Sequence, residues 1–419
     1  MKNLITSLIF CVSIFICKNA VAVQYEITDL GTLGGLSSSA KAINDLGQVT
    51  GSSPTTGSAY THAFMWDNGV ITDLGTLDGP YSYPFDINNS GQIIGYSSNG
   101  ANYDQFIWID GVMNFPGSIG ANGTYPLGSN NLGHYVGYFD DGVTKEAFLT
   151  NFYGTYIPLG TNGWNHSLAY SINEADKIVG KMFDDVNNSH ACIWDNDTVI
   201  DLGVLGRNNS YARSINSSDQ IVGSSTIGSG HTHAFFWEAG SMYDLGTLTG
   251  IYGTSYANAI NDSGQVVGQS ITESAYHAVI WENQELFDLN TFIDSGSGWT
   301  LNKAHDINNY GQIVGEGTIN GETHAFLLTP YNLVYPVRIS DFTPVDYRSL
   351  QAAYNDAADG DLIQCQTSFL NEDLFLDLNK TIIIEGGYDS EYSINNGVTR
   401  LKGKITISDG TVVIENFSL

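Results

Sequence analysis

Charged side chains are scarce in this sequence, and basic ones are scarcer still. Only 14% of its 419 residues are charged, and 15 Lys and Arg stand against 44 Asp and Glu, for a net charge of −29. Nucleic acids and anionic lipid surfaces repel a chain this acidic, which excludes them as partners. Beyond the N-terminal segment, no apolar run is long enough to cross a bilayer, so no membrane span is expected.

Cysteine is also rare, and two of the four cysteines lie in the N-terminal segment. That segment has a basic start, an apolar stretch over residues 4–17 and an A-x-A pattern, which together predict a secretory signal peptide cleaved after Ala22. Cleavage removes two lysines and leaves 13 − 44 = −31 on a secreted chain, extracellular or periplasmic. The remaining Cys192 and Cys365 lie in different regions, so no disulfide framework is implied.

Aromatic and turn-forming residues are abundant instead. The chain is 42% hydrophobic and 12% aromatic, with 47 Gly and 24 Tyr. This hydrophobicity excludes a disordered chain. Because Gly, Tyr, Ser and Asn outweigh Lys, Glu and Ala, strands and turns are favoured over long helices. The length suits one large β domain and a smaller one.

One unit is repeated seven times between residues 25 and 330. Its clearest landmark is an Ile-Asn pair, then a turn, then an apolar pair closed by Gly. The closing glycines are 44, 42, 43, 43, 45 and 47 residues apart: Gly51, Gly95, Gly137, Gly180, Gly223, Gly268 and Gly315. A His-Ala-Phe-x-Trp segment (as at 233–237) and an Asp-Leu-Gly segment (as at 244–246) follow in each unit, in full or in part. This period is typical of a propeller or solenoid, with four short strands per unit.

The two ends of the array distinguish a closed ring from an open solenoid. The array begins with a fourth-type strand at residues 25–30 and ends with a third-type strand at residues 324–328. The first piece is the one that the last unit lacks, and only a closed ring gains from this offset. We therefore predict an all-β fold, a seven-bladed β-propeller over residues 23–330. Small residues such as Ala42 and Ala40 place the first strand of each unit nearest the axis.

The repeat signatures also carry a family resemblance. His-Ala-Phe, Asp-Leu-Gly-Thr-Leu and Ala-x-x-Ile-Asn-x-x-Gly-Gln-Val-Val-Gly resemble the motifs of bacterial HAF-repeat extracellular proteins over residues 25–330. The resemblance implies secretion and a repeat architecture, and it implies no defined activity. The third unit departs most, since Lys145 and Glu146 precede Ala147 where His is expected.

Residues 341–419 form a different module after a linker at residues 331–340. Apolar residues at helical spacing, between a candidate N-cap at Asp346 and a stop at Gly360, predict one helix, and short strands follow. The segment 350–387 resembles the opening cap and first rungs of pectin-lyase-like right-handed β-helices. The later rungs, where such enzymes usually place catalytic acids and bases, are missing from this sequence. We therefore expect a β-helix-like module for docking or anchoring, without lyase activity.

Aromatic residues in the loops that enter the first strands are candidates for ligand binding. These loops open on one rim, and aromatic faces with polar neighbours suit a carbohydrate or peptide surface. Trp164, Tyr252 and Trp299 break the repeat register and are the candidate binding residues, whereas tyrosines at one register are expected to pack between blades. The repeated histidines sit at symmetric positions and are expected to bond to a neighbouring strand or loop rather than to a metal.

Several acidic residues are candidates for chemistry. Asp86 and Asp306 replace small residues two positions before the Asn. Facing the channel, they could act as general acid and base on a glycoside; a structural bond to Arg213 or a backbone amide is the alternative. Two equivalent loops carry paired acids, as Ca²⁺ ligands or as solvated turns: Asp140, Asp141, Asp184 and Asp185.

These features favour a secreted, non-catalytic binding or surface-interaction protein whose ligand is a carbohydrate or an extracellular protein. No Ser-His-Asp, zinc or phosphate-loop motif is present in the pattern, and no cofactor is expected apart from the candidate calcium. One alternative is a propeller glycoside hydrolase or polysaccharide lyase that uses channel-rim carboxylates. Another is a cell-surface protein that self-associates through residues 341–419.

Overall fold

The computed structural model describes residues 25–57, 60–98, 103–117, 122–151, 156–186, 188–196, 198–273, 275–283, 285–330, 337–340, 344–347, 350–366, 369–370, 374–388, 392–395, 397–401 and 404–418. The expected signal peptide lies outside these residues. Within them, no helix combines the length and the apolar character that a membrane crossing needs.

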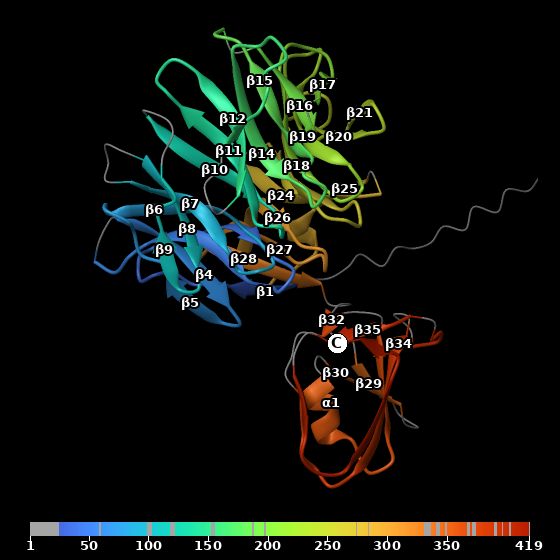
Figure 1. Cartoon of the computed structure of the whole chain (residues 1–419). Coiled ribbons are helices and arrows are strands. Elements are labelled where there is room, and N and C mark those ends of the chain that lie inside the picture. Colours follow the sequence, from blue (N-terminus) through green and yellow to red (C-terminus); the bar gives the residue numbers. More distant parts are fainter. Residues whose placement is uncertain are drawn as a thin grey trace, which may run out of the picture.

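Seven four-stranded antiparallel sheets form the large domain, as predicted (Figure 1). Blades 1 to 3 contain β2 (Ser39–Ile43), β3 (Val49–Pro54), β4 (Thr61–Asp67), β5 (Val70–Asp73); β6 (Tyr81–Ile87), β7 (Ile93–Ser98), β8 (Tyr103–Ile109), β9 (Val112–Asn114); β10 (Gly123–Ser129), β11 (His134–Asp140), β12 (Lys145–Asn151) and β13 (Ile157–Pro158). Blades 4 and 5 contain β14 (His166–Ile172), β15 (Ile178–Phe183), β16 (Ser189–Asp195), β17 (Thr198–Gly203); β18 (Ser210–Ile215), β19 (Ile221–Thr226), β20 (Thr232–Glu238) and β21 (Ser241–Asp244). Blades 6 and 7 contain β22 (Ser255–Ile260), β23 (Val266–Ile271), β24 (Tyr276–Glu282), β25 (Glu285–Asp288), the short 3-10 helix η1 (Leu289–Thr291); β26 (Trp299–Ile307), β27 (Ile313–Ile319), β28 (Glu322–Pro330) and β1 (Tyr25–Asp29).

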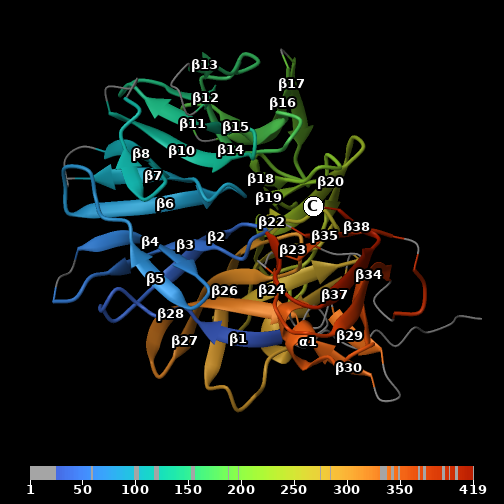
Figure 2. The same cartoon turned by 60° about the horizontal axis from the view of Figure 1, so that its bottom comes forward.

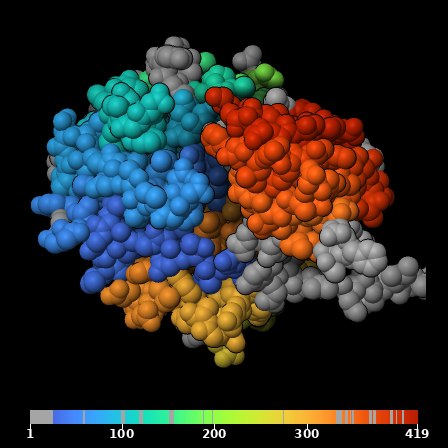
Figure 3. Space-filling model, turned by 90° about the horizontal axis from the view of Figure 1, so that it is seen from below, coloured from blue at the N-terminus to red at the C-terminus, as the bar shows by residue number. Residues whose placement is uncertain are grey.

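The ring closes through the N-terminal strand. β1 pairs antiparallel with β28, from Tyr25 opposite Pro330 to Asp29 opposite Phe326 (Figure 2). Blade 7 therefore takes three strands from the end of the array and one from its start, which confirms the prediction from the repeat offset. The space-filling view agrees, since the blue surface of the first blades lies against orange and gold surface of the last ones (Figure 3).

The Asn of each Ile-Asn landmark belongs to a closed ring of hydrogen bonds. Each side-chain amide donates to the backbone carbonyl of the equivalent Asn in the next blade, over 3.0–3.2 Å, and the last returns to the first. The seven members are Asn44, Asn88, Asn130, Asn173, Asn216, Asn261 and Asn308. Each side-chain oxygen also accepts from two amides of its own turn, as for Asn261 from Ser263 and Gln265. One buried side chain thus fixes both the hairpin and the neighbouring blade.

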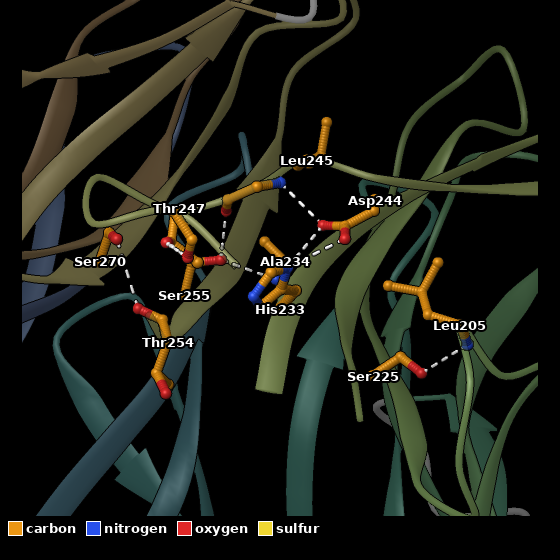
Figure 4. Close-up of polar contacts among 12 residues, drawn as sticks. Leu205, Ser225, His233, Ala234, Asp244, Leu245, Thr247, Thr254, Ser255 and Ser270 are labelled. Carbon is orange, nitrogen blue, oxygen red and sulfur yellow. Dashed lines mark hydrogen bonds and ion pairs between the residues drawn. The ribbon is translucent and has the colours of Figure 1, made fainter. Parts of the chain in front are cut away.

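Further repeated contacts join strands and blades. In Figure 4, the Ala234 amide donates to Ser255 Oγ of the next blade over 2.9 Å, and that hydroxyl donates to the Gly246 carbonyl over 2.6 Å. His233 Nδ1 lies 2.9 Å from Asp244 on the neighbouring strand. The same His–Asp pairing occurs in four other blades: His62–Asp73, His190–Asp201, His277–Asp288 and His324–Asp29. The histidines therefore bond to a neighbouring strand, as expected, and the last pair joins the two ends of the propeller.

The closing Gly of each unit is required by close packing. A Cβ on Gly268 would meet the Tyr256 carbonyl oxygen and would lie 3.1 Å from Ala257 Cα on the paired strand. The carbonyl twelve residues earlier blocks the other six closing glycines in the same way. The landmark glycine thus lets β-strands one and two of each blade approach each other.

The C-terminal module contains stacked parallel strands and one helix. Its elements are β29 (Val337–Ser340), β30 (Val345–Tyr347), α1 (Leu350–Asp356), β31 (Leu362–Gln366), β32 (Phe369–Leu370), β33 (Leu374–Leu376), β34 (Thr381–Tyr388), β35 (Thr399–Leu401), β36 (Ile405–Ile407), β37 (Thr411–Glu415) and β38 (Phe417–Ser418). Three parallel stacks form, β31–β34–β37, β32–β35–β38 and β33–β36. Buried Leu350 and Tyr354 of α1 pack with Ile363, Ile382 and Leu376 of these strands.

Two boundaries of this module differ from the sequence-based expectation. The helix begins at Leu350, and Asp346, expected as its N-cap, lies in β30 opposite Arg338 of β29. β29 itself falls within the segment expected as a linker, yet it pairs with β30 and β31. The C-terminal sheet therefore starts at Val337. The sequence did not reveal this start, because a strand residue and a helix cap look alike in a short segment of this kind.

Candidate functional site

A β-bulge in the first strand of every blade turns one side chain into the propeller axis. In all seven first strands the register skips the residue three positions before the ring Asn, and β26 has a second shift at Asn302. These seven bulged residues differ and all line one cavity: Lys41, Phe85, Leu127, Tyr170, Arg213, Asn258 and His305. Bulges re-aim side chains in this way. The strict alternation assumed from the small residues is therefore wrong at this position, although the first strands are innermost, as predicted.

The cavity at the axis has a volume of about 450 Å³. This lies within the roughly 300–1,000 Å³ of small-molecule sites. A separate, smaller hollow of about 180 Å³ lies at the Asn ring itself and is lined by the Ile-Asn residues and the residues after them. The Asn ring therefore lines a hollow of its own, distinct from the larger cavity.

Aromatic side chains form the wall of the cavity at blades 2 to 4. Phe85, Tyr138 and Tyr170 line it, and Tyr138 stacks on Tyr125 with ring centroids 4.8 Å apart and an angle of 14°. Removal from water, reinforced by Tyr125, raises the pKa of Tyr138 above its ordinary range, so its hydroxyl is neutral at physiological pH and is able to donate a hydrogen bond. Three aromatic rings, two of which carry a hydroxyl group, therefore line this side of the cavity.

Cations form the opposite wall. Arg213 is exposed to the cavity and is held between two rings, 5.3 Å from the centroid of Tyr170 and 5.3 Å from that of Tyr211. Lys41 is half-buried; burial lowers its pKa, Lys303 and Arg213 lower it further, and Glu316 opposes them. The charge of Glu316 is already engaged, since Lys303 Nζ lies 2.6 Å from its Oε1.

His305 completes this wall as a neutral group. Burial and then the charge of Lys41 lower the pKa of His305 to about 3. Its Nε2 makes no hydrogen bond with the described residues and lies 3.9 Å from Glu316 Oε2. Burial acts to raise the pKa of Glu316, but the Lys303 hydrogen bond and neighbouring positive charge hold it below its ordinary value. The carboxylate therefore stays ionised and paired with Lys303.

Asp86 and Asp306 do face the same cavity, and both bind backbone amides of the next blade. Asp86 Oδ2 accepts from the Ser129 amide over 2.6 Å, and Asp306 Oδ2 accepts from the Ile43 amide over 2.9 Å. The other oxygen of each accepts from the following residue of its own strand. This is the structural role weighed as the alternative, with a backbone amide and not Arg213 as the partner.

The two carboxyl groups differ in acidity. Removal from water raises the pKa of Asp86 to about 6 and that of Asp306 to about 8, against the hydrogen bonds that both accept, and the charge of Asp86 adds to the shift of Asp306. Near neutral pH, Asp86 is therefore mostly ionised and Asp306 mostly protonated. A role for the pair as general acid and base stays a prediction.

The aromatic residues predicted for ligand binding lie apart from the cavity and from one another. Trp164 is half-buried beside His190 in blade 4, with centroids 5.1 Å apart. Trp299 is half-buried against Phe326 in blade 7. Tyr252, in contrast, is 75% exposed. None of the three lines the axial cavity, and their binding role stays a prediction.

The paired acids of blades 3 and 4 cap their own turns. Asp141 accepts from the Val143 and Thr144 amides, and Asp184 from the Val186 and Asn188 amides. Asp140 accepts from Gly142 and faces Lys145, and Asp185 contacts His166 and Asn165. Asn187 of the second loop lies outside the described residues. Among the residues that the structure describes, no three His, Cys, Asp or Glu side chains converge as a metal site, and calcium binding stays a prediction.

Comparisons with known proteins find only distant structural resemblances. No family model matches the chain, and no curated protein matches it. Among solved structures, the β-propeller domain of the Trilobed protease from Pyrococcus furiosus has a TM-score of 0.48 at 12% identity, over 78% of this chain and 96% of that chain. Virginiamycin B lyase from Staphylococcus aureus has a TM-score of 0.46 at 12% identity, over 73% of this chain and 99% of that chain. At such low similarity these proteins assign no activity or ligand to this chain.

Proposed function

We propose that the protein is a secreted, non-catalytic binding protein of the HAF-repeat type, and that it holds a small ligand in the cavity at the propeller axis. The N-terminal signal pattern supports secretion, and the three recurring motifs support the family resemblance. The cavity supports the place and size of the ligand.

One observation carries this proposal: the structural positions of the repeat keep the same residue in every blade, whereas the position that lines the cavity differs in every blade. The ring Asn and the closing Gly recur in all seven blades, and each has a structural reason to do so. The bulged position, three residues before each ring Asn, carries seven different residue types that all line the cavity. A structural scaffold gains nothing from placing charged, aromatic and amide side chains there, whereas a site for an asymmetric ligand requires such variety.

The alternative of a glycoside hydrolase or polysaccharide lyase has less support. Both oxygens of Asp86 and of Asp306 accept backbone hydrogen bonds, which supports a structural role for the two carboxyl groups. Self-association through the C-terminal module and its kinship to pectin-lyase-like β-helices are also retained as proposals, with the stacked parallel strands as their support.

A plugged cavity tests the proposed function. Leu127 lines the cavity and is half-buried, so Leu127→Trp fills part of it. Leu132 lies in the same blade and is 60% exposed, and Leu132→Trp is therefore the matched control. Ligands found on a panel of sugars, sugar acids and small organic acids by thermal shift should lose binding with Leu127→Trp and keep it with Leu132→Trp. Equal binding to both variants, or binding that depends on Trp164 or Tyr252 instead, would contradict the axial site.

A further inference from the structure

Two cations in the axial cavity have no anionic partner. Within the part of the chain that the structure describes, Lys41 makes no ion pair, and Arg213 makes ring contacts with Tyr170 and Tyr211 only. Both side chains line the cavity. Glu316, the acid whose charge acts on Lys41, is bound to Lys303.

This arrangement is unexpected for a chain with so much acid. With 44 Asp and Glu against 15 Lys and Arg, carboxylate partners are plentiful. A cation that is removed from water without a partner is costly, and the lowered pKa of Lys41 reflects that cost. Arg213, in turn, lies 5.3 Å from two aromatic ring centroids, those of Tyr170 and Tyr211, and lines the cavity. Such a pre-positioned guanidinium suits a carboxylate, which it can bind with two parallel hydrogen bonds.

Two carboxyl groups that line the cavity limit the charge of the ligand. Asp86, largely ionised near neutral pH, and Asp306 line the same cavity. The charges that act on Asp306 are those of Asp86 and Asp45, whereas those that act on Lys41 come from Glu316, Lys303 and Arg213. The carboxyl groups and the cations thus respond to different neighbouring charges. A second negative charge on the ligand would meet the carboxylate of Asp86, so a single anionic group is favoured.

The aromatic wall indicates what carries that anionic group. Phe85, Tyr138 and Tyr170 line the cavity, and aromatic rings pack against the flat side of a sugar or of another aromatic ring. We propose that the cavity binds a small molecule that carries one carboxylate on a ring. The carboxylate pairs with Lys41 and Arg213, and the ring packs against the aromatic wall. Sugar acids and aromatic acids share this chemistry. This inference rests on the proposed function, since both place the ligand at the axis.

Isothermal titration of the full chain tests the inference with paired probes. Galacturonate and galactose form one pair, and benzoate and benzyl alcohol form the other, so that each acid has a neutral counterpart of similar shape. At least one acid should bind at least about tenfold more tightly than its neutral counterpart, and the pair in which it does so identifies the source of the carboxylate.

Variants of the two cations complete the test. Lys41→Met and Arg213→Met should each weaken that acid at least about tenfold, whereas Lys41→Arg and Arg213→Lys should retain part of the affinity. Lys177→Met removes the same charge from a lysine that pairs with Asp219 and Asp195 away from the cavity, and it should leave the affinity unchanged. An unchanged denaturation midpoint for the methionine variants shows that they are folded.

The possible failures are distinguishable. Neutral probes that bind as tightly as the acids, or acid binding that survives Lys41→Met and Arg213→Met, overturn the carboxylate inference and leave the axial site intact. Absence of binding by both acids also overturns it. Binding that is insensitive to the Leu127→Trp plug overturns the proposed function itself.

Discussion

The ring of asparagines is the feature whose removal should destabilise the propeller most for its size. Asn261 is buried and makes four side-chain hydrogen bonds. Its Nδ2 donates to the Asn308 carbonyl over 3.1 Å and to Gln265 Oε1 over 2.8 Å. Its Oδ1 accepts from the Ser263 amide over 3.1 Å and from the Gln265 amide over 3.0 Å. Asn261→Ala removes all four and leaves the partners in place.

The expected loss follows from these bonds. Each contributes about 1 kcal/mol net, and a buried partner left without a bond costs about 1–3 kcal/mol. The Asn308 carbonyl is such a partner, while water reaches the turn amides more easily because Ser263 is exposed. We therefore expect Asn261→Ala to lower the free energy of unfolding by about 3 kcal/mol. Asn309→Ala is the control, because Asn309 makes side-chain bonds to Asp45 and Asp262 on the exposed side of the same turns, and exposed bonds of this kind are worth about 1 kcal/mol or less.

Tryptophan fluorescence during guanidinium denaturation measures this loss in the full chain. All seven Trp residues lie between positions 66 and 299, so the signal reports on the propeller and not on the C-terminal module. A loss below about 1 kcal/mol for Asn261→Ala, or an equal loss for Asn309→Ala, would refute the reasoning that the ring holds the blades together.

Three further predictions concern packing, pH and closure. Gly268→Ala places a Cβ against the paired strand and should lower the unfolding free energy by about 1–3 kcal/mol. Gly228 has open space around it, so the control Gly228→Ala should change the unfolding free energy by at most about 0.5 kcal/mol. Similar changes for the two variants would contradict the close-packing argument. Because the folded-state pKa of Asp306 is raised to about 8, its contribution to the unfolding free energy is present at low pH and is lost as the pH rises towards 8. Wild-type stability should therefore fall more steeply between pH 6 and 8 than that of Asp306→Asn, by at most about 1.4 kcal/mol per pH unit. Parallel stability curves for the two proteins would be evidence against this prediction. Deletion of residues 25–29 removes β1 and exposes the edge of β28. It should lower the denaturation midpoint and promote association on size-exclusion chromatography. Wild-type stability with an unchanged elution volume would count against closure.

The fold was predictable because its determinants recur along the chain. The repeat period follows from the seven glycines and the His-Ala-Phe segments. The closure of the ring follows from the offset between residues 25–30 and 324–328. The His–Asp pairs were within reach for the same reason, since both partners belong to landmarks of one blade. Repetition thus makes even single side chains interpretable.

The site was not predictable, because it depends on one-residue displacements and on partners about 44 residues apart. A period-two reading of the first strands put Ala42 and its equivalents alone at the axis, and the bulge adds Lys41 and Arg213, which that reading left out. The Asn ring was hidden because the turn alone explained Asn44. A usable signal existed in the variety of the residue three positions before the Asn, set against the constancy around it.

Aromatic residues that break the repeat were a weaker guide. Trp164 and Trp299 stand at a position of the repeat where no other unit has Trp. Each packs beside the strand-three His of its own blade. An irregular aromatic residue in a loop fills local space as readily as it meets a ligand. Tyr252 is exposed and keeps its candidacy as a surface residue.

A crystal structure of the full chain soaked with the tighter of galacturonate or benzoate tests the central claim most directly. We expect electron density for one molecule in the axial cavity, with its carboxylate within hydrogen-bond distance of Lys41 Nζ and the Arg213 guanidinium and its ring against Tyr138 or Tyr170. Density for the acid at the outer rim near Tyr252, or an axial cavity that holds only solvent while the acid binds elsewhere, would contradict it.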